Sequence, residues 1–113
     1  MTISDAARVC GLTARAVRVY EEQQLIAIRR DAQGVRRFDQ TDIARLEFIA
    51  LCRRAGLPMD LIGTLLRLGE AEGESARSER LLAECRKQIV VLDKQRSDLA
   101  TLVAHLASSA MLP

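Results

Sequence analysis

Two arginines, Arg15 and Arg18, have the residue type and the spacing that nucleic-acid binding needs. They lie in the segment GLTARAVRVYEEQQL at residues 11–25, where Thr13 can cap a helix by accepting a backbone N–H of the first turn. Residues three apart share one face of a helix, so both guanidinium groups would point the same way while Tyr20 faces a core. Arginine forms bidentate hydrogen bonds with phosphate groups and guanine edges. The segment is typical of the recognition helix of a helix-turn-helix, or of an ordinary amphipathic helix with solvated arginines.

Residues for catalysis or metal binding are scarce. Cys10, Cys52 and Cys85 are widely spaced and odd in number, which predicts neither a disulfide framework nor a CxxC metal pair. The single histidine, His105, falls between apolar positions and is interpreted as a surface residue. With one histidine, no glycine-rich phosphate loop and no clustered carboxylates, the chain offers no catalytic constellation. We expect no enzyme activity, no metal and no cofactor.

The length and composition fit one small domain with an extension. The chain has 113 residues, of which 49% are apolar and only 3% aromatic, so aliphatic side chains must form the core. It lacks the run of about 18 apolar residues that a membrane span requires and the basic-then-apolar start of a secretory signal. We therefore expect a soluble cytoplasmic protein with no membrane partner. Residues 1–57 hold ten arginines and seven acidic residues, whereas residues 58–113 hold seven basic and eight acidic residues.

The first 38 residues predict a helix-turn-helix followed by a hairpin. The two helices are expected at residues 2–10 and 13–23, separated by Gly11. Within residues 25–38, the apolar Ile26 and Ile28 alternate with other residues, the residues Asp31–Gly34 favour a turn, and a short returning strand follows. This pattern is typical of the wing of a DNA-binding domain, and a solvated loop is the alternative. The wing would carry four arginines, namely Arg29, Arg30, Arg36 and Arg37, and would pack through Ile28 and Phe38.

Two further helices and a polar connector are predicted next. One helix spans residues 39–55, and another opens at Leu57-Pro58, ends at Gly69 and buries Leu61, Ile62, Leu65 and Leu66. We divide the chain into a DNA-binding domain (1–70), a connector (71–76), a terminal helix (77–107) and a tail (108–113).

The terminal helix has an apolar row with a seven-residue repeat. Its members alternate three and four residues apart and are Leu82, Cys85, Ile89, Leu92, Arg96, Leu99, Val103 and Leu106. At about 1.5 Å per residue the helix would be roughly 45 Å long, more than the small preceding domain can cover. A second copy of the same helix is the simplest partner, and packing against the preceding helices is the alternative. The expected fold is mainly α, a winged helix-turn-helix DNA-binding domain followed by a long coiled-coil dimerisation helix.

Residues 2–70 resemble the MerR family of bacterial transcription regulators. Three segments carry the resemblance, and they are GLTARAVRVYEE, GVRRF and RLEFIALCRRAGLPMDLIGTLL. The resemblance implies a short form without a C-terminal effector domain or metal-binding loop. It implies antiparallel terminal helices in a homodimer, which binds a pseudo-palindromic promoter site at the nucleoid and distorts it for RNA polymerase. It also implies that the DNA-contacting residues are Thr13, Arg15, Arg18 and Tyr20 of the recognition helix and Arg36 and Phe38 of the wing, with Arg30 and Arg37 beside them. Gln24 stands where the family usually has glycine.

The resemblance leaves two questions open. Some short members of the family sense aldehydes and other electrophiles through a cysteine in the third helix, one residue earlier than Cys52. Cys52 is therefore either a thiol sensor, which would need a lowered pKa, or a buried packing residue. The chain as a whole is either a regulator of promoters or an effector-independent architectural or partner-binding DNA-binding protein.

Overall fold

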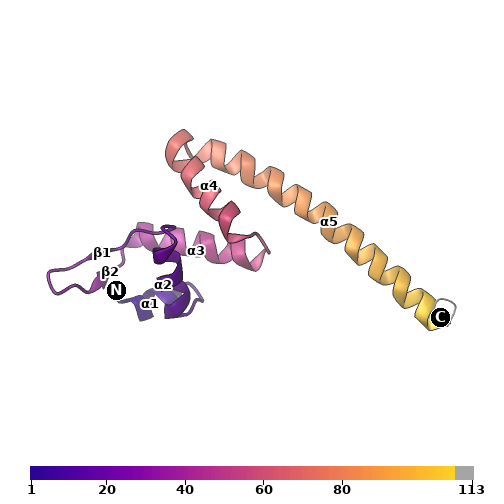
Figure 1. The fold of residues 1–113 in the computed structure, drawn as a ribbon, viewed down its shortest axis with the longest axis horizontal. Coiled ribbons are helices and arrows are strands. Elements are labelled where there is room, and N and C mark those ends of the chain that lie inside the picture. The colour runs from indigo at the N-terminus through magenta and orange to yellow at the C-terminus, as the bar shows by residue number, and fades with distance from the viewer. Residues whose placement is uncertain (109–113) are drawn as a thin grey trace. The chain divides into compact units, whose positions relative to one another are not determined.

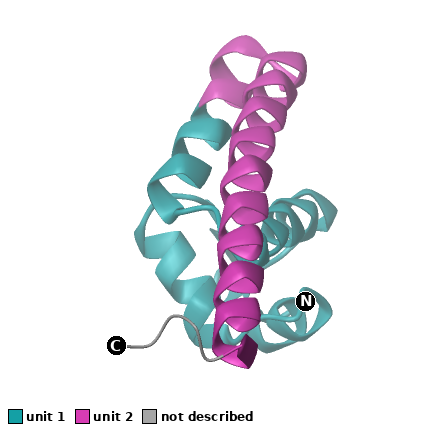
Figure 2. Cartoon of the chain, turned by 90° about the vertical axis from the view of Figure 1, so that its right-hand side faces the viewer, with its two compact units in different colours: residues 1–67 teal, residues 68–113 magenta. Residues whose placement is uncertain are grey.

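The computed structural model describes residues 1–108, which form five helices and one two-stranded hairpin (Figure 1). In chain order the elements are α1 (Ile3–Val9), α2 (Ala14–Glu22), β1 (Arg29–Arg30), β2 (Arg36–Arg37), α3 (Gln40–Arg54), α4 (Met59–Glu72) and α5 (Glu74–Ser108). The chain divides into two compact units, residues 1–67 and 68–113 (Figure 2). A mainly helical fold with a winged helix-turn-helix is confirmed.

Side-chain caps start the first three helices where the sequence predicts them. Thr2 and Asp5 form a reciprocal capping box at the start of α1, and Asp39 and Asp42 form another at the start of α3. At α2, the Thr13 hydroxyl oxygen accepts the Ala16 backbone N–H at 3.0 Å. Each cap satisfies a backbone donor that has no partner inside its own helix, so these helices begin at defined residues.

The turn after α2 contains the only non-glycine residue with a positive φ among the described residues. Gln24 has φ 61°, in the left-handed region that costs an L-residue about 1–2 kcal/mol. The Leu25 N–H then reaches back to the Tyr20 carbonyl at 2.9 Å. The backbone here has the conformation that the family's usual glycine would adopt without strain.

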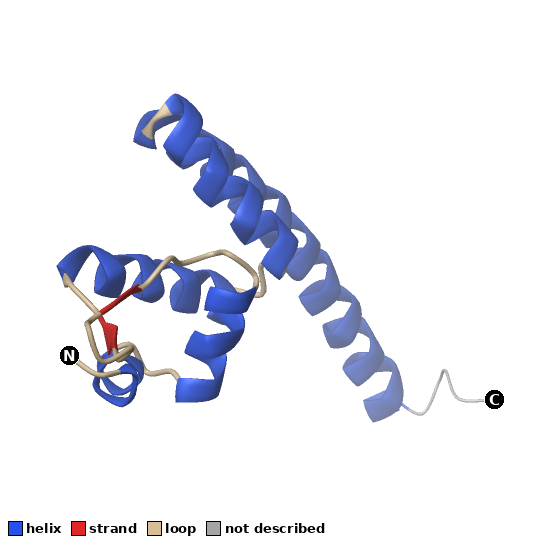
Figure 3. Cartoon of the chain, turned by 60° about the vertical axis from the view of Figure 1, so that its left-hand side comes forward, coloured by secondary structure: helices blue, strands red, loops and turns tan. Residues whose placement is uncertain are grey.

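The hairpin is shorter than predicted. β1 and β2 contribute two residues each and pair antiparallel, with Arg29 opposite Arg37 and Arg30 opposite Arg36 (Figure 3). The predicted packing residue Phe38 is buried, and Ile28 is half-buried. The remainder of residues 25–38 is turn and extended chain, because the turn from Asp31 to Gly34 begins directly after β1 and leaves room for only two paired residues in each strand.

An aliphatic core holds the first unit together. Its largest fully buried side chains come from α2, α3 and α4, and are Val17, Leu46, Ile49, Ile62 and Leu65. Leu66 is also buried, as predicted, but Leu61 is only half-buried. The core lies on the inner face of α2, which fixes the direction of the outer face.

The predicted helix end at Gly69 and the predicted connector at 71–76 are wrong. α4 continues through Gly69 to Glu72, and only Gly73, with φ 99°, separates it from α5. A glycine inside a helix costs only about 1 kcal/mol relative to alanine, and its neighbours are mostly helix formers. Gly69 also lies close to Arg77, since an added Cβ would be 3.1 Å from the Arg77 Cδ. Gly69 is therefore a close-approach residue, not a terminator.

α5 is a single uninterrupted helix of 35 residues. It begins three residues before the predicted start and includes Ser108, and the rest of the predicted tail, 109–113, lies outside the described residues. No residue of α5 is buried in the single chain. Among residues 1–108, no helix is both long and apolar enough to cross a membrane.

Candidate nucleic-acid interface

The outer face of α2 presents two arginines. Arg15 and Arg18 are exposed, whereas Val17 and Tyr20 on the opposite face are 1% and 8% exposed. Within residues 1–108, neither Arg15 nor Arg18 forms an ion pair with an acidic side chain. Both guanidinium groups are therefore available to an external anion, as the sequence predicts.

Arg15 borders a surface depression of about 320 Å³ at the N-terminal end of α2. The depression is lined by Thr13, Arg15, Ala16, Val19, Tyr20, Arg53 and Met59. Arg53, from the end of α3, donates from Nη1 to the Leu57 carbonyl at 3.0 Å. Sequence analysis gave Arg53 no DNA-binding role, although it lies in the third segment that resembles the MerR family, three residues before Gly56. The fold brings it to the same depression as two predicted DNA-contacting residues, Thr13 and Arg15.

Every arginine of the hairpin has an acidic partner. The closest nitrogen–oxygen distances are 2.8 Å for Arg29–Asp39, 3.8 Å for Arg30–Glu21, 2.8 Å for Arg36–Glu21 and 2.7 Å for Arg37–Asp31. Arg29, Arg30 and Arg37 are exposed, whereas Arg36 is half-buried. The hairpin thus differs from α2, because its four arginines already lie near three carboxylates, those of Glu21, Asp31 and Asp39.

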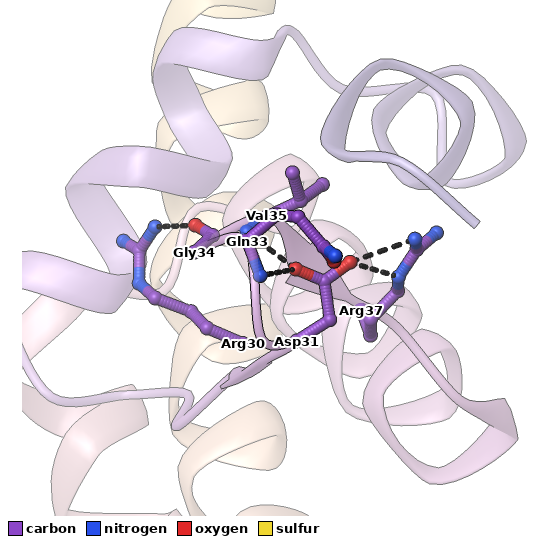
Figure 4. A network of polar contacts seen from close by, with 6 residues as sticks. All are labelled: Arg30, Asp31, Gln33, Gly34, Val35 and Arg37. Atoms are coloured by element: carbon purple, nitrogen blue, oxygen red, sulfur yellow. Dashed lines mark hydrogen bonds and ion pairs between the residues drawn. The ribbon is translucent and has the colours of Figure 1, made fainter.

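Asp31 organises the turn of the hairpin (Figure 4). One carboxylate oxygen accepts the backbone N–H groups of Gln33 at 2.9 Å and Val35 at 3.0 Å, and the other accepts Arg37 Nε at 2.9 Å. The hydrogen bond from Val35 is the main cause that lowers the pKa of Asp31 below its usual value, and Arg37 and Gln33 add to it. Arg30 closes the turn from the other side through a hydrogen bond to the Gly34 carbonyl at 3.0 Å. The turn is therefore held by its own side chains.

Three of the predicted DNA-contacting residues have structural roles in this fold. The rings of Tyr20 and Phe38 are 8% and 7% exposed and belong to the core. Arg36 is turned toward Glu21, and about a quarter of its side chain is exposed. Burial leaves these three side chains little surface for DNA, and their predicted contact with DNA stays a prediction. Thr13, Arg15, Arg18, Arg30 and Arg37 remain exposed at the predicted interface.

The cysteines lie apart and are buried or half-buried. Cys52, on the buried face of α3, is 4% exposed, as expected of a packing residue; its role as a thiol sensor stays a prediction. Burial raises the pKa of the Cys10 thiol, and the negative charge of Glu47 adds to the shift. Cys85 is half-buried on α5. Among residues 1–108, no three His, Cys, Asp or Glu side chains are grouped as metal ligands.

The predicted dimerisation row is largely exposed in the single chain. The aliphatic members Leu82, Ile89, Leu92, Leu99, Val103 and Leu106 are between 48% and 66% exposed. Arg96 is exposed as well. Such a row of exposed apolar side chains on one helix is unusual for a protein surface.

Comparison with known proteins agrees with this geometry. The sequence model described as MerR HTH family regulatory protein matches residues 1–68, and the one described as MerR, DNA binding matches residues 43–108. The HTH-type transcriptional regulator CueR of Escherichia coli O157:H7 is 32% identical over 108 residues, which cover 90% of this chain and 80% of CueR.

Solved structures share the fold. A crystal structure assigned to a MerR family transcriptional regulator from Listeria monocytogenes covers 95% of this chain and 86% of that chain, with a TM-score of 0.74 and 31% identity. The structure of HiNmlR, a MerR family regulator lacking the sensor domain and bound to promoter DNA, covers 100% of this chain and 96% of that chain, with a TM-score of 0.71 and 22% identity. The chain belongs to the MerR family of transcription regulators, whose DNA-binding helix-turn-helix is formed here by α1 and α2.

Proposed function

We propose that this chain is a dimeric regulator that binds a pseudo-palindromic promoter site and distorts it to control transcription. The observation that carries the proposal is the outer face of α2, where Arg15 and Arg18 are exposed and free of acidic partners among the described residues. A capped helix that packs on one face and presents arginines on the other is suited to the major groove. There an arginine can make two hydrogen bonds to a guanine.

Phosphate contacts would come from both sides of the recognition helix. Arg30 and Arg37 are exposed on the hairpin, and Arg53 lies beside Arg15 at the depression. Phosphate contacts set affinity and orientation, whereas base edges set sequence preference. In this arrangement Arg15 and Arg18 read the sequence, and the flanking arginines hold the backbone.

The dimer would form through the apolar row of α5. An antiparallel pair of these helices covers the exposed leucine, isoleucine and valine side chains and relates two recognition helices by a two-fold axis. A two-fold dimer requires a two-fold DNA site. Bending or untwisting such a site has an energy that depends on its sequence, and that distortion would let RNA polymerase align with the promoter. We place this action at the nucleoid in the bacterial cytoplasm.

The orientation of the helices can be tested at Cys85. In a parallel dimer the two Cys85 thiols would meet at one level of the seam, whereas in the antiparallel dimer they lie far apart. Mild oxidation of the native protein should therefore give no Cys85–Cys85 disulfide, as judged by non-reducing electrophoresis and peptide mapping. A rapid, complete crosslink between the two copies of Cys85 would establish the parallel arrangement instead.

Selection of bound duplexes from a random pool tests the proposed function directly. The selection is run at one stated salt concentration, because phosphate contacts make the affinity salt-dependent. Enrichment of an inverted repeat would establish a dimeric sequence-specific regulator. Binding without enrichment, lost as salt is raised, would overturn the proposal in favour of an effector-independent architectural protein.

A further inference from the structure

A single carboxylate connects the recognition helix to both strands of the hairpin. Glu21, in the last turn of α2, accepts a hydrogen bond from Arg36 Nε at 2.8 Å. The Arg30 Nη2 lies 3.8 Å from the same Glu21 oxygen. About a fifth of the Glu21 side chain is exposed, so this ion pair is partly withdrawn from solvent.

The register of the hairpin allows Glu21 to contact both strands at the same level. Arg30 and Arg36 are Cα partners across the two strands, so Glu21 contacts both members of one cross-strand pair. A hairpin with two paired residues per strand is marginal without packing partners. At the base of the hairpin, Phe38 is buried and Arg29 pairs with Asp39. Glu21 adds a contact from α2.

We propose that Glu21 is a positioning residue for DNA recognition, which fixes the hairpin at a set orientation to α2. The inference rests on the proposed function. The exposed Arg15 and Arg18 of α2 and the exposed Arg30 and Arg37 of the hairpin can reach one DNA site together only if the two elements keep a fixed geometry. Glu21 supplies that geometry without contacting DNA.

The proposal predicts an effect opposite in sign to simple electrostatics. A carboxylate near DNA repels phosphate, so its removal should strengthen binding to every duplex if charge alone matters. If Glu21 positions the hairpin, its removal weakens binding to the preferred site even though a repulsive charge has gone. The direction of the change therefore separates the two roles.

Glu21→Gln is the test, and Glu22→Gln is the matched control. Both remove one negative charge from the same turn of α2, but Glu22 is exposed and has no ion-pair partner within residues 1–108. Affinity is measured for the duplex enriched by selection and for a scrambled duplex of the same length and composition. We expect E21Q to lose about tenfold on the selected duplex, the size of a coupling of about 1.4 kcal/mol, and to lose clearly less on the scrambled one, where base and phosphate contacts need not be made together. E22Q should bind both at least as well as the native protein. Equal gains by E21Q on both duplexes would overturn the proposal.

Backbone hydrogen exchange of the DNA-free protein tests the same contact without any operator. In E21Q the amides of residues 29–37 should exchange faster than in the native protein, whereas E22Q leaves them unchanged. Arg36→Gln removes the contact from the other side and should accelerate the same amides, and the double variant should add nothing further. Unchanged exchange in E21Q would overturn the positioning role, whatever the DNA selection shows. Faster exchange with no enriched duplex would refute the proposed function and leave the structural connection standing.

Discussion

Replacing Leu92 with aspartate should separate the proposed dimer into monomers. Leu92 lies in the middle of the apolar row of α5 and is 48% exposed in the single chain. Full burial of a leucine side chain contributes about 1.5–3 kcal/mol, so the half that a partner can still cover contributes about 1 kcal/mol per copy. A carboxylate placed in the seam adds a desolvation penalty of several kcal/mol.

The dimer contains this change twice, which sets the expected magnitude. The two copies together should cost about 6 kcal/mol or more, and each 1.4 kcal/mol changes the dissociation constant tenfold. The dissociation constant should therefore rise by about four orders of magnitude. A native dimer that is tight at nanomolar concentration would then be monomeric in the micromolar range.

Val90→Asp is the matched control for this experiment. Val90 is 68% exposed on the same helix, but it follows Ile89 by one residue and so lies about 100° away from the row. Sedimentation velocity across a concentration series should show L92D as a monomer and V90D as a dimer, and circular dichroism should show that both remain helical. A dimeric L92D would refute the assigned seam. Equal dissociation of both variants would indicate that added negative charge, not loss of the row, separates the chains.

Three further predictions concern the DNA-binding unit. Arg18→Ala should weaken binding to the selected duplex by about 1–3 kcal/mol if Arg18 reads a base edge, and an equal loss on scrambled duplexes in the same titration would make it a phosphate contact. Gln24→Gly should raise the free energy of unfolding in urea by about 0.5–1 kcal/mol, because glycine adopts the left-handed backbone at φ 61° without strain. The greater flexibility of glycine in the unfolded chain offsets part of this gain. A destabilised variant would contradict this prediction. The pKa of Asp31 is lowered in the fold, so the order it gives the turn is fully present above its unfolded pKa and is lost as pH falls through the folded value. Protection factors of the Gln33 and Val35 amides should therefore fall in acid, and Asp31→Asn should remove that acid dependence; a profile identical in the variant would exclude Asp31 as the cause.

The sequence predicts the helix starts well because capping is local. Thr2 with Asp5, and Asp39 with Asp42, each meet three residues apart, so the donor and the acceptor are visible in one short segment. Gly69 shows the limit of such local reasoning. A glycine can end a helix by adopting a positive φ, or it can lie inside a helix where a neighbouring side chain needs room. Only the three-dimensional path of the chain distinguishes these two roles.

The exposed arginines of the site could be predicted from the sequence, but the acidic side chains that pair with the hairpin arginines could not. The spacing of Arg15 and Arg18 depends on one helical turn, whereas Glu21 meets Arg36 across 15 residues of turn and strand. Helical spacing places Glu21 four residues after the buried Val17 and Glu22 four residues after the exposed Arg18, but it does not show that Arg36 is the partner of Glu21. Similarly, Tyr20 falls at a position that serves either a core or a DNA contact, and its burial follows from the packing of the first unit.

The ion pairs suggest different roles for α2 and the hairpin, with α2 reading the DNA sequence and the hairpin orienting α2. Arg15 and Arg18 have no acidic partners within residues 1–108, so contact with DNA adds their interactions without breaking others. The hairpin arginines already lie near carboxylates, so part of the attraction that a phosphate could offer them is supplied within the fold, and their net gain on DNA is smaller. The hairpin should therefore contribute more to the placement of α2 than to affinity. That division gives Glu21 its importance, because a hairpin that contributes mainly geometry is useful only while its own position is fixed.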